Sequence, residues 1–225
     1  MSNLIFPKLK GLTWNNKYTD EFFTLIQKAA APGYETRVSL GPDPIIHFEL
    51  EYGYLRQNSG QAITDELAIL RGFYRARNGD FDSFLVWFPD LTQNEDDGSV
   101  VDQLLTPDAN SIAPLIVTRE GYDENIYEAF GVNGDPGAAP LISYDGMPIV
   151  SGADYNFVGP GFSLAGITYP GLAVQFLTSP IGHVVTADFA WYYRVRFEDG
   201  TQEFDAFLAL LYSAQKVKLM TTRTS

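Results

Sequence analysis

Short apolar runs separated by turn-forming residues are the feature that most limits how this chain can fold. From Leu115 onward, Gly, Pro, Asn and Asp interrupt the apolar residues at intervals of roughly ten residues. This spacing is typical of an antiparallel β region. The strands expected from it are 115–119, 125–131, 140–144, 147–150, 162–168, 172–177 and 184–197.

An alternating pattern earlier in the chain predicts another strand within residues 35–56. The apolar members of the pattern are Ile46, Phe48, Leu50 and Tyr52, and the residues between them are His47, Glu49 and Glu51. Side chains of a strand point alternately to its two faces, so this strand is expected to be half-buried. The preceding Gly41-Pro42-Asp43-Pro44 predicts a turn or an irregular edge, because proline stiffens the backbone and removes a donor.

Residues 64–78 carry the clearest helical signal. Thr64 can cap the helix, and apolar residues follow at helical spacing from Leu67 to Phe73. Asn78-Gly79 is expected to end it.

Three further elements are expected from the sequence. The aromatic run 81–88, closed by Pro89-Asp90, indicates a mostly buried strand on which the helix packs. Residues 204–211 fit one face of a short helix. Residues 213–222 alternate between apolar residues and lysine, which predicts a closing edge strand with lysine gatekeepers. The stretch from 91 to about 114 carries no clear periodicity.

We therefore predict a mainly β fold. It is expected to be an antiparallel β-sandwich or barrel-like domain with one packed α-helix and a β-rich middle elaboration. Residues 1–90 and 181–225 would form the main domain, and residues 91–180 an insertion or second subdomain.

Charge and composition exclude several classes of protein. Twenty-eight acidic against 15 basic residues leave a formal net charge of −13, which repels nucleic-acid phosphates and disfavours specific binding. A solvated acidic exterior explains this balance, and so does a surface past which DNA slides. The chain has no cysteine, which rules out disulfides, thiolate metal sites and cysteine nucleophiles. No stretch approaches the roughly 18 apolar residues of a membrane span, so we expect a soluble, unsecreted protein without membrane insertion.

The residues that could catalyse a reaction or bind a metal lack a supporting motif. His47 and His183 have no paired metal-ligand spacing, and each is expected to have a surface or structural role. The acidic run 95–98 lacks the ligand pattern of an EF-hand and is expected to be a solvent loop. Glu49 and Glu51 share one strand face but have no opposing carboxylate, as a glycosidase would need. We predict no catalytic residue, no cofactor and no metal ion, and a protein that is not an enzyme.

Motifs near the two ends of the chain resemble a known family. The first group comprises Phe6-Pro7, Tyr34-Glu35-Thr36-Arg37, the helix end Phe73-Tyr74-Arg75-Ala76-Arg77-Asn78-Gly79 and the aromatic strand 81–90. The second comprises Thr186-Ala187-Asp188-Phe189 and Arg194-Val195-Arg196-Phe197. Their order and content are similar to those of the distal tail proteins of long-tailed bacteriophages and gene transfer agents. Residues 91–180 resemble this family only in their β-rich, turn-rich composition.

The resemblance implies a structural virion protein at the distal end of the tail, made in the host cytoplasm. In that family a β-sandwich with a packed helix forms a ring, here expected to be a homohexamer, around the DNA channel. The implied partners are other copies of this chain, the tail tube protein and the tail tip or hub protein of the baseplate. DNA is expected to pass through the channel without specific binding.

The resemblance also singles out residues. Self-contacts are expected along strand 34–56, helix 64–78 and segment 186–222. One departure from the family is the bulky Trp191-Tyr192-Tyr193, whose extra rings could serve the core or a partner surface. The residues assigned to the family signature and to self-assembly are Arg37, Phe73, Arg77, Gly79, Phe84, Asp90, Asp188, Phe189, Arg194, Arg196 and Phe197.

Two other functions stay open on the sequence alone. A carbohydrate-binding β-sandwich used in host adsorption would take its recognition loops from residues 91–180 and its sugar-stacking rings from the abundant aromatic residues. Glycan binding by an isolated monomer would favour it. A glycosidase would require two essential carboxylates at a defined separation, whose substitution abolishes hydrolysis.

Overall fold

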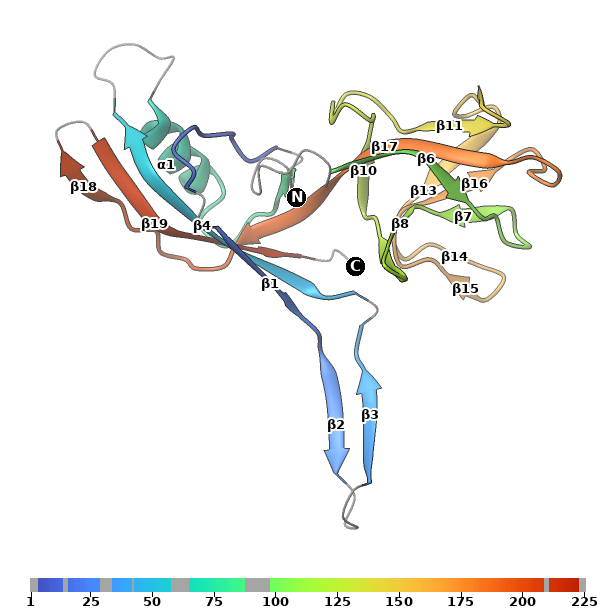
Figure 1. Ribbon diagram of the computed structural model, residues 1–225, viewed down its shortest axis with the longest axis horizontal. Coiled ribbons are helices and arrows are strands. Elements are labelled where there is room, and N and C mark those ends of the chain that lie inside the picture. Colours follow the sequence, from blue (N-terminus) through green and yellow to red (C-terminus); the bar gives the residue numbers. More distant parts are fainter. Residues whose placement is uncertain are drawn as a thin grey trace. The chain divides into compact units, whose positions relative to one another are not determined.

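The computed structural model describes residues 4–13, 16–28, 34–41, 43–57, 65–87, 98–208 and 211–222. Within these residues lie one α-helix and nineteen β-strands (Figure 1). The strand pairs with a defined register are antiparallel. The prediction of a mainly β, antiparallel fold with one helix is confirmed. No helix in the described part of the chain has the length and apolar content to cross a membrane.

The chain divides into two compact units. Unit 1 combines Met1–Phe84 with Val195–Thr222, and unit 2 is formed by Leu85–Arg194. The boundaries expected from the sequence lie after residues 90 and 180, whereas those of the structure lie after residues 84 and 194. The second boundary falls inside a single long strand, β17 (Val185–Phe197).

Unit 1 is built on an antiparallel sheet in the order β1-β4-β19-β17, with β18 also paired to β19. Strand β4 buries Phe48, Leu50 and Tyr52, as their alternation predicts. It pairs along most of its length with β19, so the two segments of unit 1 meet at the centre of the sheet. The strands are β1 (Lys17–Glu21), β2 (Thr24–Lys28), β3 (Glu35–Ser39), β4 (Ile45–Arg56), β18 (Asp205–Leu208) and β19 (Leu211–Thr221).

Helix α1 (Glu66–Ala76) belongs to unit 1 and contacts β4. Asp65 caps the helix by accepting a hydrogen bond from the Ala68 amide at 2.9 Å, while Thr64, the expected cap, lies outside the described residues. The helix buries Leu67 and Leu70, two of the apolar residues that predict it.

An ion pair fixes the start of α1 to the end of β4. Glu66, only 5% exposed, accepts hydrogen bonds from Arg56 Nε at 3.1 Å and from an Arg56 terminal nitrogen at 2.5 Å. These bonds hold the pKa of Glu66 below its usual value, because they favour the charged carboxylate. The pair therefore orients the helix on the sheet.

Among its described residues, unit 2 has two larger sheets around a common core and two separate hairpins, β8-β9 and β14-β15. In the first, β17 pairs with β6, β10 and β11, and β11 pairs with β12; the second has the order β13-β16-β7. Alternate residues of β17, from Val185 to Trp191, face the core and meet Val174 and Phe176 of β16. The strands are β5 (Phe84–Val86), β6 (Ser99–Leu105), β7 (Ile112–Pro114), β8 (Ile116–Arg119), β9 (Tyr122–Asn125), β10 (Glu128–Phe130), β11 (Leu141–Tyr144), β12 (Met147–Pro148), β13 (Tyr155–Val158), β14 (Ser163–Leu164), β15 (Ile167–Thr168) and β16 (Ala173–Phe176).

Two expectations for the C-terminal segment are wrong. The helix expected at 204–211 is replaced in the described residues by strand β18, Asp205–Leu208, which pairs with β19. A short apolar run fits either structure. Residues 213–222 do not form an edge strand, because β19 lies between β4 and β17 and buries Val217 and Leu219.

Three other segments differ from their expected extent. The strand expected at 162–168 is a hairpin of β14 and β15, which turns through Ala165 and Gly166 at φ of 51° and 83°. Of the described residues in 81–88, only Phe84–Val86 is a strand. The stretch 91–114, where no strand is expected, contains β6 and β7. Strand β6 lacks a regular alternation because its register against β17 shifts at an irregularity.

Candidate assembly surface

A hairpin in unit 1, which we call the arm, is exposed along both of its strands in the described part of the chain. The arm consists of Phe22–Lys28 and Tyr34–Leu40, with β2 and β3 as its two strands. In Figure 1 these strands run beyond the ends of β1 and β4. Every residue of β2 and β3 is exposed.

The arm arises from an irregularity in one long ribbon. Pairing of β1 with β4 stops at Glu21 and Ile45, and pairing of β2 with β3 starts at Thr24 and Ser39. Two residues on the first strand therefore face five on the second, a longer insertion than a common bulge. The longer side contains Gly41-Pro42-Asp43-Pro44, where a turn or an irregular edge is expected; Pro42 lies outside the described residues.

The two faces of the arm differ in character. Leu25 is paired with Val38, and the ladder continues to Phe23 and Leu40 through a 2.8 Å bond from the Leu40 amide to the Phe23 carbonyl. Since paired residues share a face, these four side chains form one apolar surface, with exposed fractions of 48% (Phe23), 56% (Leu25), 47% (Val38) and 66% (Leu40). The paired Gln27 and Thr36 lie further along this same face. The opposite face carries Thr24, Ile26, Lys28, Glu35, Arg37 and Ser39.

Strand β1 offers a second uncovered surface, the edge of the unit 1 sheet. It pairs with β4 on one side, and no described strand pairs with its other side. All five residues of β1 are exposed, including Tyr18 at 60%. Such an edge presents backbone donors and acceptors that another strand can engage.

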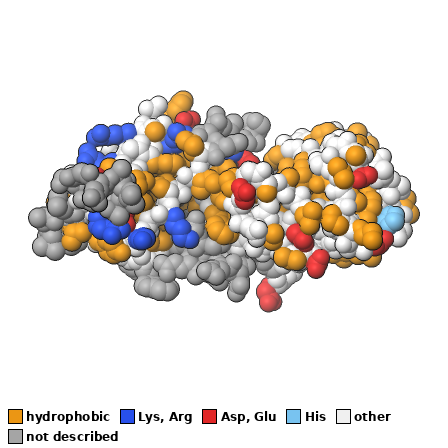
Figure 2. Space-filling model, turned by 90° about the horizontal axis from the view of Figure 1, so that it is seen from above, with side chains coloured by type: hydrophobic (Ala, Val, Ile, Leu, Met, Phe, Trp, Pro, Cys, Tyr) orange, Lys and Arg blue, Asp and Glu red, His pale blue; other side chains and the backbone are white. Residues whose placement is uncertain are grey.

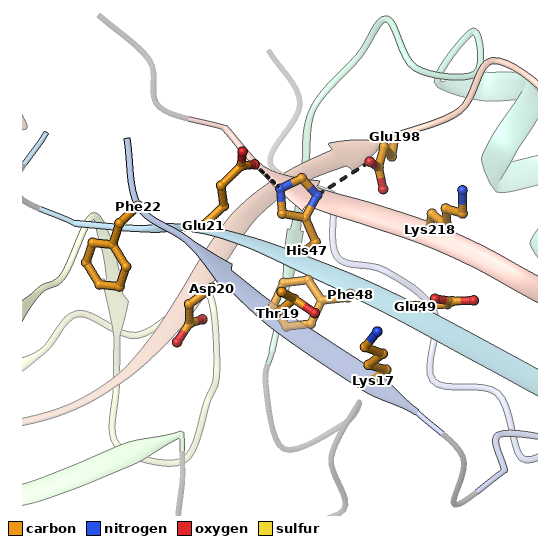
Figure 3. A pocket seen from close by; sticks show the side chains of 10 residues that line it. All are labelled: Lys17, Thr19, Asp20, Glu21, Phe22, His47, Phe48, Glu49, Glu198 and Lys218. Atoms are coloured by element: carbon orange, nitrogen blue, oxygen red, sulfur yellow. Dashed lines mark hydrogen bonds and ion pairs between the residues drawn. The ribbon is translucent and has the colours of Figure 1, made fainter. Parts of the chain in front are cut away.

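A groove of about 560 Å³ lies where the arm leaves the sheet (Figure 3). His47 of β4 points into it between two carboxylates, with Nε2 3.0 Å from Glu21 and Nδ1 3.5 Å from Glu198. Lys218 completes the charged network through Asp199, at 3.1 Å. His47 therefore links β4 to Glu21 at the end of β1 and to Glu198 just after β17.

Three of the signature phenylalanines meet in the core of unit 1. The ring of Phe84 lies 4.9 Å from Phe73 and 5.0 Å from Phe197, and Phe6 stacks on it at 5.7 Å. Phe84 is fully buried, and Phe6 and Phe197 are nearly so. These residues hold α1 and β17 together, which is a packing role.

Two further signature residues shape the end of α1. Arg77 is 8% exposed, lies over the Phe73 ring at 5.6 Å and approaches Asp82 at 3.8 Å. Gly79 has a φ of 65°, and a Cβ there would lie 3.0 Å from the Tyr74 hydroxyl. Both positions are explained by the helix end itself.

The remaining signature residues do not join this cluster. Arg37 lies on the polar face of the arm, where its Nε donates to Glu35 at 2.6 Å. Arg196 is in the unit 1 part of β17 and donates to the Phe197 carbonyl at 2.9 Å. Asp90 lies outside the described residues.

Three signature residues belong to unit 2. Asp188 accepts a 2.7 Å hydrogen bond from the Asp102 amide, and Phe189 is buried in the unit 2 core. Arg194, 9% exposed, donates to Glu128 at 2.6 Å. The signature motifs thus fall in two separate units, and within each the structure gives them mostly internal contacts.

The bulky Trp191-Tyr192-Tyr193 also serves unit 2 internally. Trp191 is 2% exposed in its core, and Tyr192 packs on Trp87 and Phe130. Tyr193 donates a 2.6 Å hydrogen bond to Glu124. The departure from the family pattern is therefore explained by packing.

The candidate chemical groups are dispersed. Among the described residues, no three His, Asp or Glu side chains are arranged to hold a metal ion. His183 contacts Asp145 at 2.7 Å and stacks on Tyr144 at 5.0 Å in unit 2. Of the two glutamates on the polar face of β4, Glu49 is paired with Lys216 at 3.7 Å.

Charge is distributed unevenly between the two units. Residues 85–194 contain 14 of the 28 acidic residues but only two of the 15 basic ones, Arg119 and Arg194. This segment therefore accounts for −12 of the net charge of −13. In the view of Figure 2, the Lys and Arg side chains gather over unit 1.

A scan against protein-family models finds no family that matches this sequence. A search of the curated proteins likewise finds no match.

The surfaces that best fit an assembly role are not predicted from the sequence. The pattern predicts no strand at residues 17–28, so β1 and half of the arm are not expected. A signal was present, because Phe23 and Leu25 alternate with Thr24 in the same way as Val38 and Leu40 alternate with Ser39. Phe22 and Ile26 obscure this alternation.

Proposed function

We propose that this chain is a structural virion protein, a distal tail subunit that forms a ring joining the tail tube to the tail tip. The observation that carries the proposal is the uncovered apolar face of the arm, whose four side chains are 47–66% exposed. A two-stranded hairpin is marginally stable by itself, and an apolar patch of this kind marks a protein contact.

The outer edge of β1, where no described strand pairs, supports the same function. The arm and the β1 edge are different surfaces, so a contact between them in two copies would be head-to-tail. Contacts of that type repeat until a ring closes. The proposed ring is a homohexamer whose two rims face the tail tube protein and the tail tip or hub protein.

The charge supports the passage of DNA without binding. Residues 85–194 carry −12 of the net charge of −13, so a channel lined by this segment would repel phosphates and would not retain DNA. The tail assignment itself rests on the resemblance of the motifs around Phe73 and Phe197 to those of distal tail proteins.

Light scattering across a concentration series, followed by negative-stain imaging, tests the proposal. A ring of about six chains of 25.0 kDa each is the expected species. A strict monomer at every concentration would contradict self-assembly. A glycan screen on that monomer would then test the alternative, a carbohydrate-binding module for host adsorption.

A further inference from the structure

We propose that His47 is a pH-dependent clasp at the root of the arm. In its protonated form it holds Glu21 and Glu198 together and fixes the direction of the arm, and in its neutral form it loosens that hold. The clasp lies within one chain, so it does not require self-assembly. Only its consequence for assembly rests on the proposed function.

The backbone at the root of the arm has the character of a hinge. Ladder pairing stops at Glu21 and Ile45 and starts again at Thr24 and Ser39, so residues outside both ladders separate the arm from the sheet. Segments at the ends of regular elements absorb the changes in φ and ψ when one part of a protein turns against another. The direction of the arm therefore depends on the side-chain contacts of Glu21, the last residue of β1.

The imidazole of His47 ties Glu21 to the body of the sheet (Figure 3). The backbone of His47 belongs to β4, which is paired on both sides, and its Nε2 lies 3.0 Å from Glu21. Its Nδ1 lies 3.5 Å from Glu198, whose own amide donates to the Lys218 carbonyl at 2.9 Å. The ring thus bridges a residue at the hinge and a residue fixed to the sheet.

The number of protons on the imidazole decides how firmly this bridge holds. A neutral imidazole has one N–H, so it can donate to only one of two carboxylates, whereas an imidazolium donates from both nitrogens. The positive charge also strengthens each contact, because charge-assisted hydrogen bonds are about twice as strong as neutral ones. Histidine side chains change charge between about pH 5 and 8. The clasp is therefore closed at the acidic end of this range and loosens as the pH rises through it.

The other charged groups around His47 come from β1, β4, the turn after β17 and β19. Besides Glu21 and Glu198, those that line the groove are Lys17, Asp20, Glu49 and Lys218. Glu49 is paired with Lys216 at 3.7 Å, and Lys218 with Asp199 at 3.1 Å. Of these residue types, only histidine ordinarily changes charge between about pH 5 and 8. A response of the arm in this range therefore reports on His47.

The distance between two spin labels tests the clasp in dilute monomer. The chain has no cysteine, so Thr36→Cys and Arg71→Cys place one label on the arm and one on α1, both at exposed positions. Pulsed electron spin resonance should give a narrow distance distribution at about pH 5 and a broader one at about pH 8. The population outside the main peak should rise about 3-fold, as expected for ion pairs that are partly exposed to water. A distribution that does not change with pH would overturn the clasp.

A matched pair of glutamine variants locates the effect. Glu21→Gln removes the charge that the imidazolium holds at the hinge and should abolish the pH response. Glu49→Gln removes a carboxylate of the same groove that is paired with Lys216 instead, and should keep the response. His47→Gln should abolish it as well. A response that survives in His47→Gln, or that Glu49→Gln removes equally, would overturn the assignment to this clasp.

Light scattering at the two pH values connects the clasp to assembly. A fixed arm should make the wild type assemble more readily at about pH 5 than at about pH 8, and His47→Gln, which carries the same change in overall charge apart from one residue, should reduce this difference. A distance distribution that responds to pH without any change in assembly would support the clasp and contradict the arm as an assembly surface. Assembly without a pH response of the arm would overturn the clasp and leave the proposed ring standing.

Discussion

Replacing Phe84 by alanine should destabilise unit 1 severely without touching the proposed assembly surface. Phe84 is fully buried, and its ring contacts Phe73, Phe197 and Phe6 at centroid distances of 4.9, 5.0 and 5.7 Å. Removing a buried phenylalanine costs about 3–5 kcal/mol in lost transfer free energy and cavity formation. Three ring contacts, each worth roughly 0.5–1.5 kcal/mol, place the expected loss in the upper part of that range.

The neighbouring Phe81 provides the control. Its side chain is 80% exposed, so Phe81→Ala should change the free energy of unfolding by less than about 0.5 kcal/mol. Phe84→Leu keeps most of the apolar volume and loses the ring contacts, and should fall between the two at roughly 1.5–3 kcal/mol.

Urea unfolding followed by far-ultraviolet circular dichroism measures these differences. Hydrogen exchange then locates them, because amides of β4 and β19 should lose protection while those of β13 and β16 in unit 2 keep it. A loss below about 1 kcal/mol for Phe84→Ala, together with loss of assembly, would refute the reasoning. It would mean that the signature aromatic residues act at an interface and not in the core.

Three further outcomes follow from local contacts. Gly79→Ala should destabilise the protein more than Gly121→Ala. Both glycines have a positive φ, but only at Gly79 does the new Cβ meet the Tyr74 hydroxyl. The difference between the urea midpoints of the two variants therefore measures that contact. Because the pKa of Glu66 is lowered in the folded state, its carboxylate stabilises the fold above the usual pKa near 4.5. This stabilisation is lost as the pH falls through the folded-state pKa, so Glu66→Gln should flatten the decline in stability below about pH 4.5. An unchanged profile of stability against pH would count against the pair with Arg56. Added salt should strengthen self-assembly, because it screens the repulsion between the acidic unit 2 segments of different copies. Dissociation at about 0.5 M salt, measured by light scattering, would contradict an apolar contact between nearly neutral surfaces.

The sequence best predicts the elements whose apolar residues recur at the regular spacing of a strand or a helix. The alternation around Phe48 predicts β4, and the helical spacing from Leu67 predicts α1, because each element buries one face of a regular period. Strand β17 also lies close to its expected range of 184–197.

Features that depend on distant partners are not encoded in such patterns. Residues 204–211 carry a short apolar run that fits a helix, and only pairing with β19 decides for a strand. The lysines of β19 suggest an edge, but Glu49 and Asp199 come from elsewhere in unit 1 to neutralise them. The same holds for the apolar face of the arm, because the sequence around Leu25 does not show whether other residues cover it.

The division of unit 1 into two segments governs when a newly made chain can fold. A ribosome completes Leu85–Arg194 in one continuous stretch, so unit 2 can fold while synthesis continues. Strand β4 must wait for β19, which is translated last, before the sheet that supports β1 is closed. Chains that end before β19 therefore lack the strand that pairs with β4, although they already carry the arm. Translation order thus leaves an incomplete chain with an exposed arm on an unfinished sheet.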